Sequence, residues 1–165
     1  MMPDDDAPVT QWAALHGTKK FLYIQSLSGY RRSLRDEQGY HTYVAPKPAA
    51  ALLGAELLKA LNRSRFIDPD EDRGFFEMDR VVELYERWVN DSIVRYEYKS
   101  RKQLFDHMSW CVIWRRNGEI LMRPHRWVKA EYWKDLAYDK DVIIPATTDV
   151  EQLGVAAELA LSRCK

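Results

Sequence analysis

The sequence predicts a single α+β domain in which helices pack against a mixed or antiparallel β-sheet. Its 165 residues are enough for one domain with a proper core and too few for two. The composition, 46% hydrophobic and 30% charged, is that of an ordinary globular protein. Short runs of strand-forming residues are interspersed with longer segments of helical periodicity. We expect residues 1–18 to form a flexible arm and residues 19–165 to form the domain.

The first half of the domain begins with two predicted strands and a helix. The segment "KKFLYIQSLS" carries strand-type residues from Phe21 to Ile24, and "YHTYVAP" is a second strand that stops at Pro46. We expect the intervening "GYRRSLRDEQG" to be a charged loop or a turn of helix. Pro48 suits the start of the helix that follows. The apolar face of that helix comprises Leu53, Leu57, Ala60 and Leu61.

An acidic loop and a long amphipathic helix are expected next. "FIDPDEDRG" has the proline, glycine and acid content of a loop, and "FFEMDRVVELYERWVNDS" places apolar residues at helical spacing. The expected apolar stripe consists of Met78, Val81, Val82, Tyr85, Trp88 and Val89. "IVRYEYK" alternates two sets of side chains, so we predict a half-buried strand there.

The second half predicts a short helix, a β-hairpin, a strand and a final helix. Ser100 is expected to cap the helix in "SRKQLFDHM", and Asn117-Gly118 suits the turn of the hairpin "SWCVIWRRNGEILMRP". The strand at 110–114 is apolar on both faces and should be central in its sheet. The pattern of "HRWVKAEYWKDL" is compatible with either a helical turn or a loop. "DVIIP" is the last strand, and Thr148 with Glu151 forms a capping box. The final apolar face is Leu153, Ala156, Ala157, Ala160 and Cys164.

Two of the predicted helices have similar sequences. "LGAELLKALNRSR" begins at Leu53 and "LGVAAELALSRCK" begins at Leu153. One interpretation is convergence between Ala-Leu-rich helices, and the other is that the chain contains two related halves. In the second case both helices would pack on one face of a shared sheet, with Gly54 and Gly154 allowing close approach. In either case these helices are framework and do not mark a catalytic site.

The charge and the two cysteines limit the class of protein. The formal net charge is zero, which by itself predicts neither a nucleic-acid binder nor a membrane-surface protein. No apolar run approaches the ~20 residues that cross a bilayer, and the start "MMPDDDAPVT" is acidic where a secretory signal is basic. We therefore expect a cytoplasmic protein. Cys111 should be buried, and a disulfide with Cys164 is possible but disfavoured in a reducing compartment.

The sequence contains no recognisable catalytic constellation. It has no GxGxxG, no GxxxxGK[ST], no GxSxG and no HExxH motif. We expect no cofactor, no metal and no enzymatic activity. A weak alternative is a metal-free nuclease in which His107 and His125 act as general acid and base.

A stronger alternative is a domain that binds RNA or another nucleic acid through the basic and aromatic segment "RRNGEILMRPHRWVKAEYWK". Its candidate residues are Arg115, Arg116, Arg123, Arg126 and Lys129, with Trp127, Tyr132 and Trp133 for stacking. The competing interpretation is that these aromatic residues are core and the basic residues pair with an acidic helix. We favour the second, because an acidic segment of equal charge balances the basic one.

The C-terminal half resembles the immunity proteins of bacterial contact-dependent growth inhibition (CDI) systems, a group long catalogued as a domain of unknown function. The resemblance rests on "YKSRKQLFDHMSWCVI", the Asn-Gly hairpin, "VIIP", "EQLG" and "ALSRC". It covers residues 96–164 well and the N-terminal part more loosely. It implies a non-enzymatic inhibitor that binds the C-terminal toxin domain of a large, cell-delivered effector. Such toxins are commonly nucleases, and the family's motifs identify framework positions only.

The acidic segment supplies a candidate toxin-binding surface. Residues 66–91 contain nine acidic residues against three arginines. A nuclease active site is electropositive because it holds phosphates, so an inhibitor can present carboxylates to that field. The competing interpretation is a solvated acidic helix. The candidate residues are Asp68, Asp70, Glu71, Asp72, Glu77, Asp79, Glu83 and Glu86.

Overall fold

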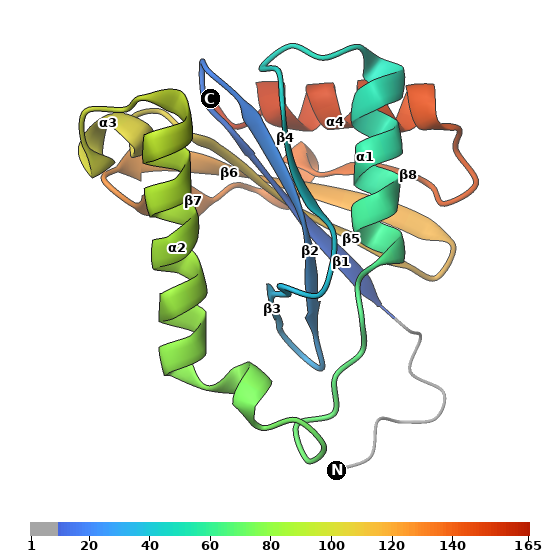
Figure 1. Cartoon of the computed structure of the whole chain (residues 1–165). Coiled ribbons are helices and arrows are strands. Elements are labelled where there is room, and N and C mark those ends of the chain that lie inside the picture. The colour runs from blue at the N-terminus through green and yellow to red at the C-terminus, as the bar shows by residue number, and fades with distance from the viewer. Residues whose placement is uncertain (1–9) are drawn as a thin grey trace.

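The computed structural model of this chain describes residues 10–165 (Figure 1). The strands in this part are β1 (Gln11–Gly17), β2 (Leu22–Gly29), β3 (Ser33–Arg35), β4 (His41–Val44), β5 (Ser109–Arg116), β6 (Glu119–Lys129), β7 (Tyr132–Asp135) and β8 (Val142–Pro145). The helices are α1 (Ala50–Asn62), α2 (Met78–Tyr96), α3 (Arg101–Phe105) and α4 (Val150–Ser162), with short 3-10 turns η1 (Gly74–Phe76) and η2 (Tyr138–Lys140).

The strands form one antiparallel sheet. Their order is β3-β2-β1-β5-β6-β7, with β4 also paired to β2 and β8 also paired to β6. Each of these pairings is antiparallel. The predicted single α+β domain, with helices packed on a mixed or antiparallel sheet, is therefore confirmed.

The β5–β6 hairpin turns at Asn117 and Gly118, as the sequence predicts. Their φ angles are 53° and 74°, the left-handed conformation that an Asn-Gly pair adopts readily in a type I′ turn. β5 lies between β1 and β6, which confirms its predicted central place. Cys111 on this strand is fully buried, and its Sγ lies 3.5 Å from the Sγ of Cys164, which is also a free thiol.

The helices cover the two faces of the sheet separately. Leu22 and Ile24 of β2 pack into a core with α1, α4 and β5, whereas Phe21 and Tyr23 pack into an aromatic cluster with α2 and α3. Because neighbouring residues of a strand point to opposite faces, the two clusters lie on opposite sides of the sheet. Figure 1 shows α1 and α4 together on one side and α2 and α3 on the other.

α1 and α4 pack against each other at their glycines, on one face of the sheet. A Cβ atom added to Gly54 would overlap the carbonyl oxygen of Val150, and one added to Gly154 would overlap that of Ala50. The predicted apolar faces of both helices are buried. The two similar segments are therefore framework on one face of the sheet.

The predicted strand at "IVRYEYK" is wrong, because α2 continues through this segment to Tyr96. Helical spacing brings Ser92 to the buried face, where its Oγ lies 2.8 Å from the hydroxyl of Tyr43. It also stacks Tyr96 on Phe21, with 4.6 Å between the ring centroids. The helix ends at Glu97, whose φ of 54° reverses the chain.

The buried stripe of α2 also differs from the expected one. Trp88 and Val89 are buried as predicted, but the other buried positions are Leu84 and Ser92. Met78 is 62% exposed, because it begins the helix beyond the edge of the sheet, and Val82 is 49% exposed.

Other segments correct the expected boundaries. Within the predicted arm of residues 1–18, residues 11–17 form β1, an interior strand between β2 and β5, and residues 1–9 lie outside the described part. The charged loop contains β3, and "HRWVKAEYWKDL" forms the end of β6 and all of β7. Asp149, not Thr148, caps α4 by accepting a bond from the backbone N–H of Gln152. Ser100 caps α3 as predicted.

Candidate functional site

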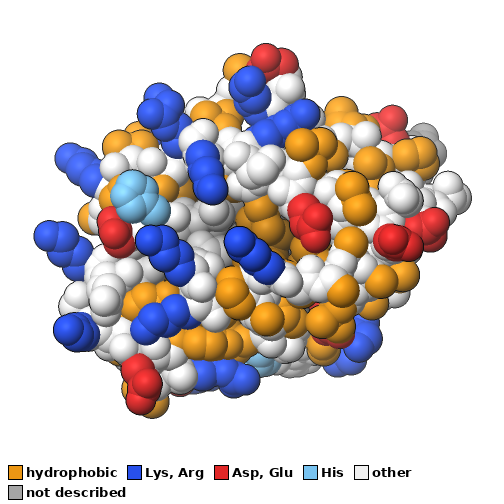
Figure 2. Space-filling view, turned by 90° about the horizontal axis from the view of Figure 1, so that it is seen from above, with side chains coloured by type: hydrophobic (Ala, Val, Ile, Leu, Met, Phe, Trp, Pro, Cys, Tyr) orange, Lys and Arg blue, Asp and Glu red, His pale blue; other side chains and the backbone are white. Residues whose placement is uncertain are grey.

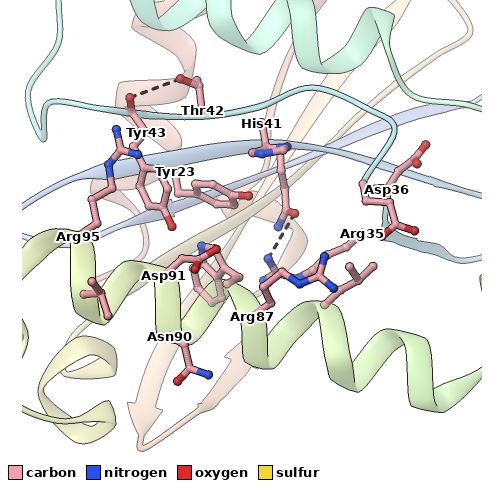
Figure 3. A pocket seen from close by; sticks show the side chains of 15 residues that line it. Tyr23, Arg35, Asp36, His41, Thr42, Tyr43, Arg87, Asn90, Asp91 and Arg95 are labelled. Atoms are coloured by element: carbon pink, nitrogen blue, oxygen red, sulfur yellow. Dashed lines mark hydrogen bonds between the residues drawn. The ribbon is translucent and has the colours of Figure 1, made fainter.

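A cleft of about 800 Å³ opens between α2 and the strands β2, β3 and β4. α2 contributes Arg87, Asp91 and Arg95 on one side, and β4 contributes His41 and Tyr43 on the other (Figure 3). The cleft exists because α2 touches the sheet through its aromatic stripe and leaves the outer edges of β3 and β4 uncovered. It is the principal candidate site.

Aromatic side chains form the floor of the cleft. The Tyr23 ring lies 4.6 Å from Tyr43 and 5.6 Å from Trp88, measured between centroids. Burial raises the pKa of the Tyr23 phenol, so this group is protonated at neutral pH. The buried indole N–H of Trp88 has no hydrogen-bond acceptor within residues 10–165.

Arg35 places a cation beside this floor. Its guanidinium lies 4.3 Å from the Trp88 ring centroid and donates to Gln25 Oε1 at 3.3 Å. Burial lowers the pKa of Arg35, and no carboxylate of the described chain forms an ion pair with it. A desolvated guanidinium without a carboxylate partner is suited to receive an anionic group of a ligand.

Ion pairs brace the mouth of the cleft. Asp36 accepts two bonds of 2.8 Å from Arg65 and one of 2.6 Å from the Ser28 hydroxyl. These bonds outweigh the effect of burial and hold the pKa of Asp36 below its ordinary value. Arg80 donates to the backbone carbonyl of Arg35 at 3.0 Å. The last bond ties the first turns of α2 to β3 and so fixes the width of the cleft.

The loop residues of the predicted acidic surface lie at the end of the molecule where α2 begins (Figure 1). Asp70 and Glu71 are exposed and make no ion pair with another described residue. Asp68 accepts a bond from the backbone N–H of Asp70, and Asp72 accepts one from that of Phe75. The first pair is free to meet a partner, whereas the second pair also shapes the loop.

The helical residues of that surface are divided. Glu77 and Asp79 are exposed at the first turn of α2 and have no ion-pair partner in the described chain. Glu83 pairs with Arg87 at 2.9 Å. Glu86 receives two bonds from Arg101, a residue that also binds Glu131 and so joins α2 to α3 and the β6–β7 turn. Glu83 and Glu86 are therefore partly neutralised within the molecule.

Sequence reasoning missed the cleft. The sequence pattern predicts Arg35 in a charged loop and Trp88 in a buried stripe, and nothing in it shows that the two side chains meet. The one local signal was "SLR", the short alternating stretch that becomes β3.

Half of the residues of the nucleic-acid alternative are engaged within the fold, whereas the other half are exposed, namely Arg116, Arg126, Lys129 and Tyr132. Arg115 donates to Gln11 and Asn62, and Arg123 pairs with Asp141 at 2.8 Å. The indole N–H groups of Trp127 and Trp133 donate to backbone carbonyls. This arrangement fits the framework interpretation of the segment.

The two histidines of the nuclease alternative have separate surroundings. His125 is buried against Trp110, at 4.1 Å between centroids, and burial lowers its pKa. His107 is exposed and lies against Trp127. Within residues 10–165 no group of three or more His, Cys, Asp or Glu side chains could hold a metal ion. None of the described helices is long and apolar enough to cross a membrane.

Known proteins resemble this chain over nearly its whole length. The Yersinia pseudotuberculosis (serotype O:3, strain YPIII) immunity protein CdiI-YPIII is 30% identical over 175 aligned positions, which cover 98% of this chain and 99% of that protein. A Neisseria meningitidis protein of unknown function, NMB0488, superposes with a TM-score of 0.89 at 32% identity and full coverage of both chains.

A chain in a CdiA-CT/CdiI toxin and immunity complex from Yersinia pseudotuberculosis superposes with a TM-score of 0.88 at 28% identity, covering 97% of this chain and 100% of that one. The family model for the CDI immunity protein matches residues 11–164. The chain therefore belongs to the CDI immunity protein family.

Proposed function

We propose that this protein binds and neutralises the C-terminal toxin domain of a cognate CDI effector. The observation that carries the proposal is the full-length similarity to an immunity protein and to a chain solved in a toxin and immunity complex. The protein acts in the cytoplasm, where it meets toxin delivered by neighbouring cells. It acts stoichiometrically and not as an enzyme.

The chemistry of the cleft supports an inhibitor that binds without transforming its partner. Its central groups are guanidinium and phenol side chains that keep one protonation state at neutral pH, and such groups hold a ligand in place. The cleft presents tyrosine, tryptophan and arginine side chains, and these are the residue types that contribute most of the binding energy at protein interfaces.

The acidic surface and the cleft together form the proposed contact region. Asp70, Glu71, Glu77 and Asp79 are exposed in the loop before α2 and at the start of α2, without ion-pair partners among the described residues. A nuclease toxin carries a positive field around its active site, and these carboxylates would steer it into place. Glu83 and Glu86 contribute less, because Arg87 and Arg101 already neutralise them. Asp68 and Asp72 contribute mainly by shaping the loop.

The steering is tested with the double variant Asp70→Lys and Glu71→Lys. We expect association with the toxin domain of the neighbouring effector gene to be slower by about tenfold at low salt. The difference should be smaller at 0.5 M salt, where the Debye length is only ~4 Å. Stopped-flow fluorescence gives the rate constants. The melting temperature should be unchanged, since both side chains are exposed.

The matched control is Glu119→Lys with Asp139→Lys, which makes the same charge change on the β5–β6 hairpin and in η2. If both pairs slowed association equally, only the total charge would matter, and the proposed steering role of the acidic surface would be refuted. A wild-type protein that neither co-purifies with the toxin domain nor suppresses its toxicity would refute the proposed function itself.

A further inference from the structure

A second depression, of about 1000 Å³, lies at the end of the molecule opposite the acidic loop. We call it the lysine groove. It is bounded by the β1–β2 turn, the β4–α1 connection, the region after α3 and the last turn of α4. Figure 2 views this end, where lysine and arginine side chains surround a hollow with hydrophobic atoms in it. The cleft described above does not extend into this groove, because the two share no lining residue.

The floor of the lysine groove is apolar. Leu22 and Leu53 belong to the main core, and Leu161 packs against that core from α4. Pro46 and Pro48 add rigid apolar surface on the side of the β4–α1 connection. The floor therefore favours a ligand that presents hydrocarbon side chains.

The rim of the groove is positively charged. Lys19, Lys47 and Lys165 are exposed and form no ion pair with any residue that the structure describes. Lys20 is also on the rim and donates to the carbonyl oxygen of Tyr96 at 2.8 Å. The carboxylates that line the groove are Asp106 and Glu158. Four lysines against two acids give the groove an excess of positive charge.

The Tyr98 and His107 rings that line the groove each already have a neighbouring group, which favours a peptide over single-stranded nucleic acid. The Lys20 ammonium lies 4.5 Å over the Tyr98 ring, and the hydroxyl of Tyr98 donates to Thr18. The His107 ring lies 4.6 Å from that of Trp127. Bases need free aromatic faces on which to stack, whereas an acidic peptide needs only the cations and the apolar floor.

We propose that the lysine groove binds an acidic polypeptide segment, one that places apolar side chains on the floor and carboxylates against the lysine rim. The segment comes from a protein other than the toxin domain, because the proposed toxin contacts lie at the opposite end of the molecule. Charge complementarity and the apolar floor together define the partner. The protein would then hold two partners at once.

The test measures fluorescence anisotropy of a short labelled peptide of alternating glutamate and leucine. We expect saturable binding that weakens when glutamine replaces glutamate or when serine replaces leucine. The variant Lys19→Glu with Lys47→Glu should weaken binding by about tenfold. The matched control, Lys129→Glu with Lys134→Glu, makes the same charge change on β6 and β7 and should bind the peptide as the wild type does.

Four outcomes would overturn the proposal. These are no saturable binding by the wild type, equal weakening by the two lysine pairs, tighter binding of a uridine oligonucleotide of the same net charge, and loss of toxin neutralisation in the Lys19 and Lys47 variant. The last outcome would place the toxin itself in the groove. Failure of the Asp70 and Glu71 experiment would remove the reason for excluding the toxin domain as the source of the segment, whereas binding of the acidic peptide in the groove is decided by the anisotropy measurement, because the two surfaces share no residue.

Discussion

At the scale of single residues, His16 is the clearest source of pH sensitivity. It is buried on β1, with its ring 4.8 Å from that of Trp88, and its Nδ1 has no hydrogen-bond partner among the described residues. Burial holds the pKa of His16 well below its ordinary value of 6.5, and the positive charge of Arg35 adds to the effect. The folded protein therefore keeps this imidazole neutral in mildly acidic solution.

We predict that the free energy of unfolding falls as the pH drops below 6.5. The reason is that His16 becomes protonated in the unfolded chain at this pH but stays neutral in the folded protein. One such group contributes a slope of about 1.4 kcal/mol per pH unit, until the pH reaches the lowered pKa. His125 acts in the same direction. Urea denaturation at a series of pH values measures the slope.

His16→Phe should make that slope shallower by the contribution of one proton. His41→Phe, at an exposed position of β4, is the matched control and should keep the wild-type slope. An unchanged slope in the His16 variant would show that other groups cause the acid sensitivity.

The sequence could indicate the residues of the acidic surface but not which of them are free. Exposure of Asp70 and Glu71 follows from a loop rich in acids and proline. The ion pair between Glu86 and Arg101 depends on how α3 packs against α2, and no local sequence pattern predicts that packing. The same limit applies to Arg35, whose importance arises from its contact with Trp88 in a distant element.

At the scale of elements, the contact between α1 and α4 is the tightest helix packing that the structure describes. Gly54 and Gly154 each face the backbone of the other helix, so there is no room for a side chain at either position. Both helices bury their apolar faces in the same core. The sequence indicated this contact because both glycines recur in otherwise similar helices.

We predict that Gly54→Ala lowers the free energy of unfolding by about 2 kcal/mol or more, even though alanine is the better helix former. The methyl group would push α1 away from Val150 and open the core. Chemical denaturation checks the value. Gly74→Ala is the control, because its nearest neighbour would be Asp72 Oδ1 at 3.6 Å, and it should be close to neutral. Equal stability of the Gly54 variant would contradict the packing.

The erroneous strand at "IVRYEYK" shows where local pattern fails. Its alternation of side chains is compatible with a strand, but the same residues also continue the helical spacing of Trp88 and Ser92. Tertiary contacts decide between the two, since Tyr43 and Phe21 offer partners only to the helix. The capping residue of α4 was missed by one position for a similar reason, because Asp149 and Thr148 are both good caps.

At the scale of the whole molecule, a net charge of zero conceals a strong separation of charge. The acidic loop and the first turn of α2 lie at one end, and the lysine groove lies at the other. Such a molecule is oriented by the field of a charged partner before contact. The fold class was predictable from composition and periodicity, but this separation was not, because it depends on which loops meet at each end.

We predict that bound toxin domain slows amide hydrogen exchange in β3, β4 and α2, and leaves α4 unaffected. The reason is that β3, β4 and α2 line the cleft and α2 also carries part of the acidic surface. Exchange followed by mass spectrometry, with and without toxin, gives the footprint. Protection confined to α4 and the β1–β2 turn would contradict the proposed contact region.

The glycine contact between α1 and α4 also bears on how the protein is made. α1 and α4 are separated in the sequence by α2, α3 and the strands β5 to β8, so the core that they share stays open until α4 has been translated. A nascent or prematurely terminated chain would expose that apolar face to chaperones and proteases. The shared core thus closes only in copies of the chain that include α4.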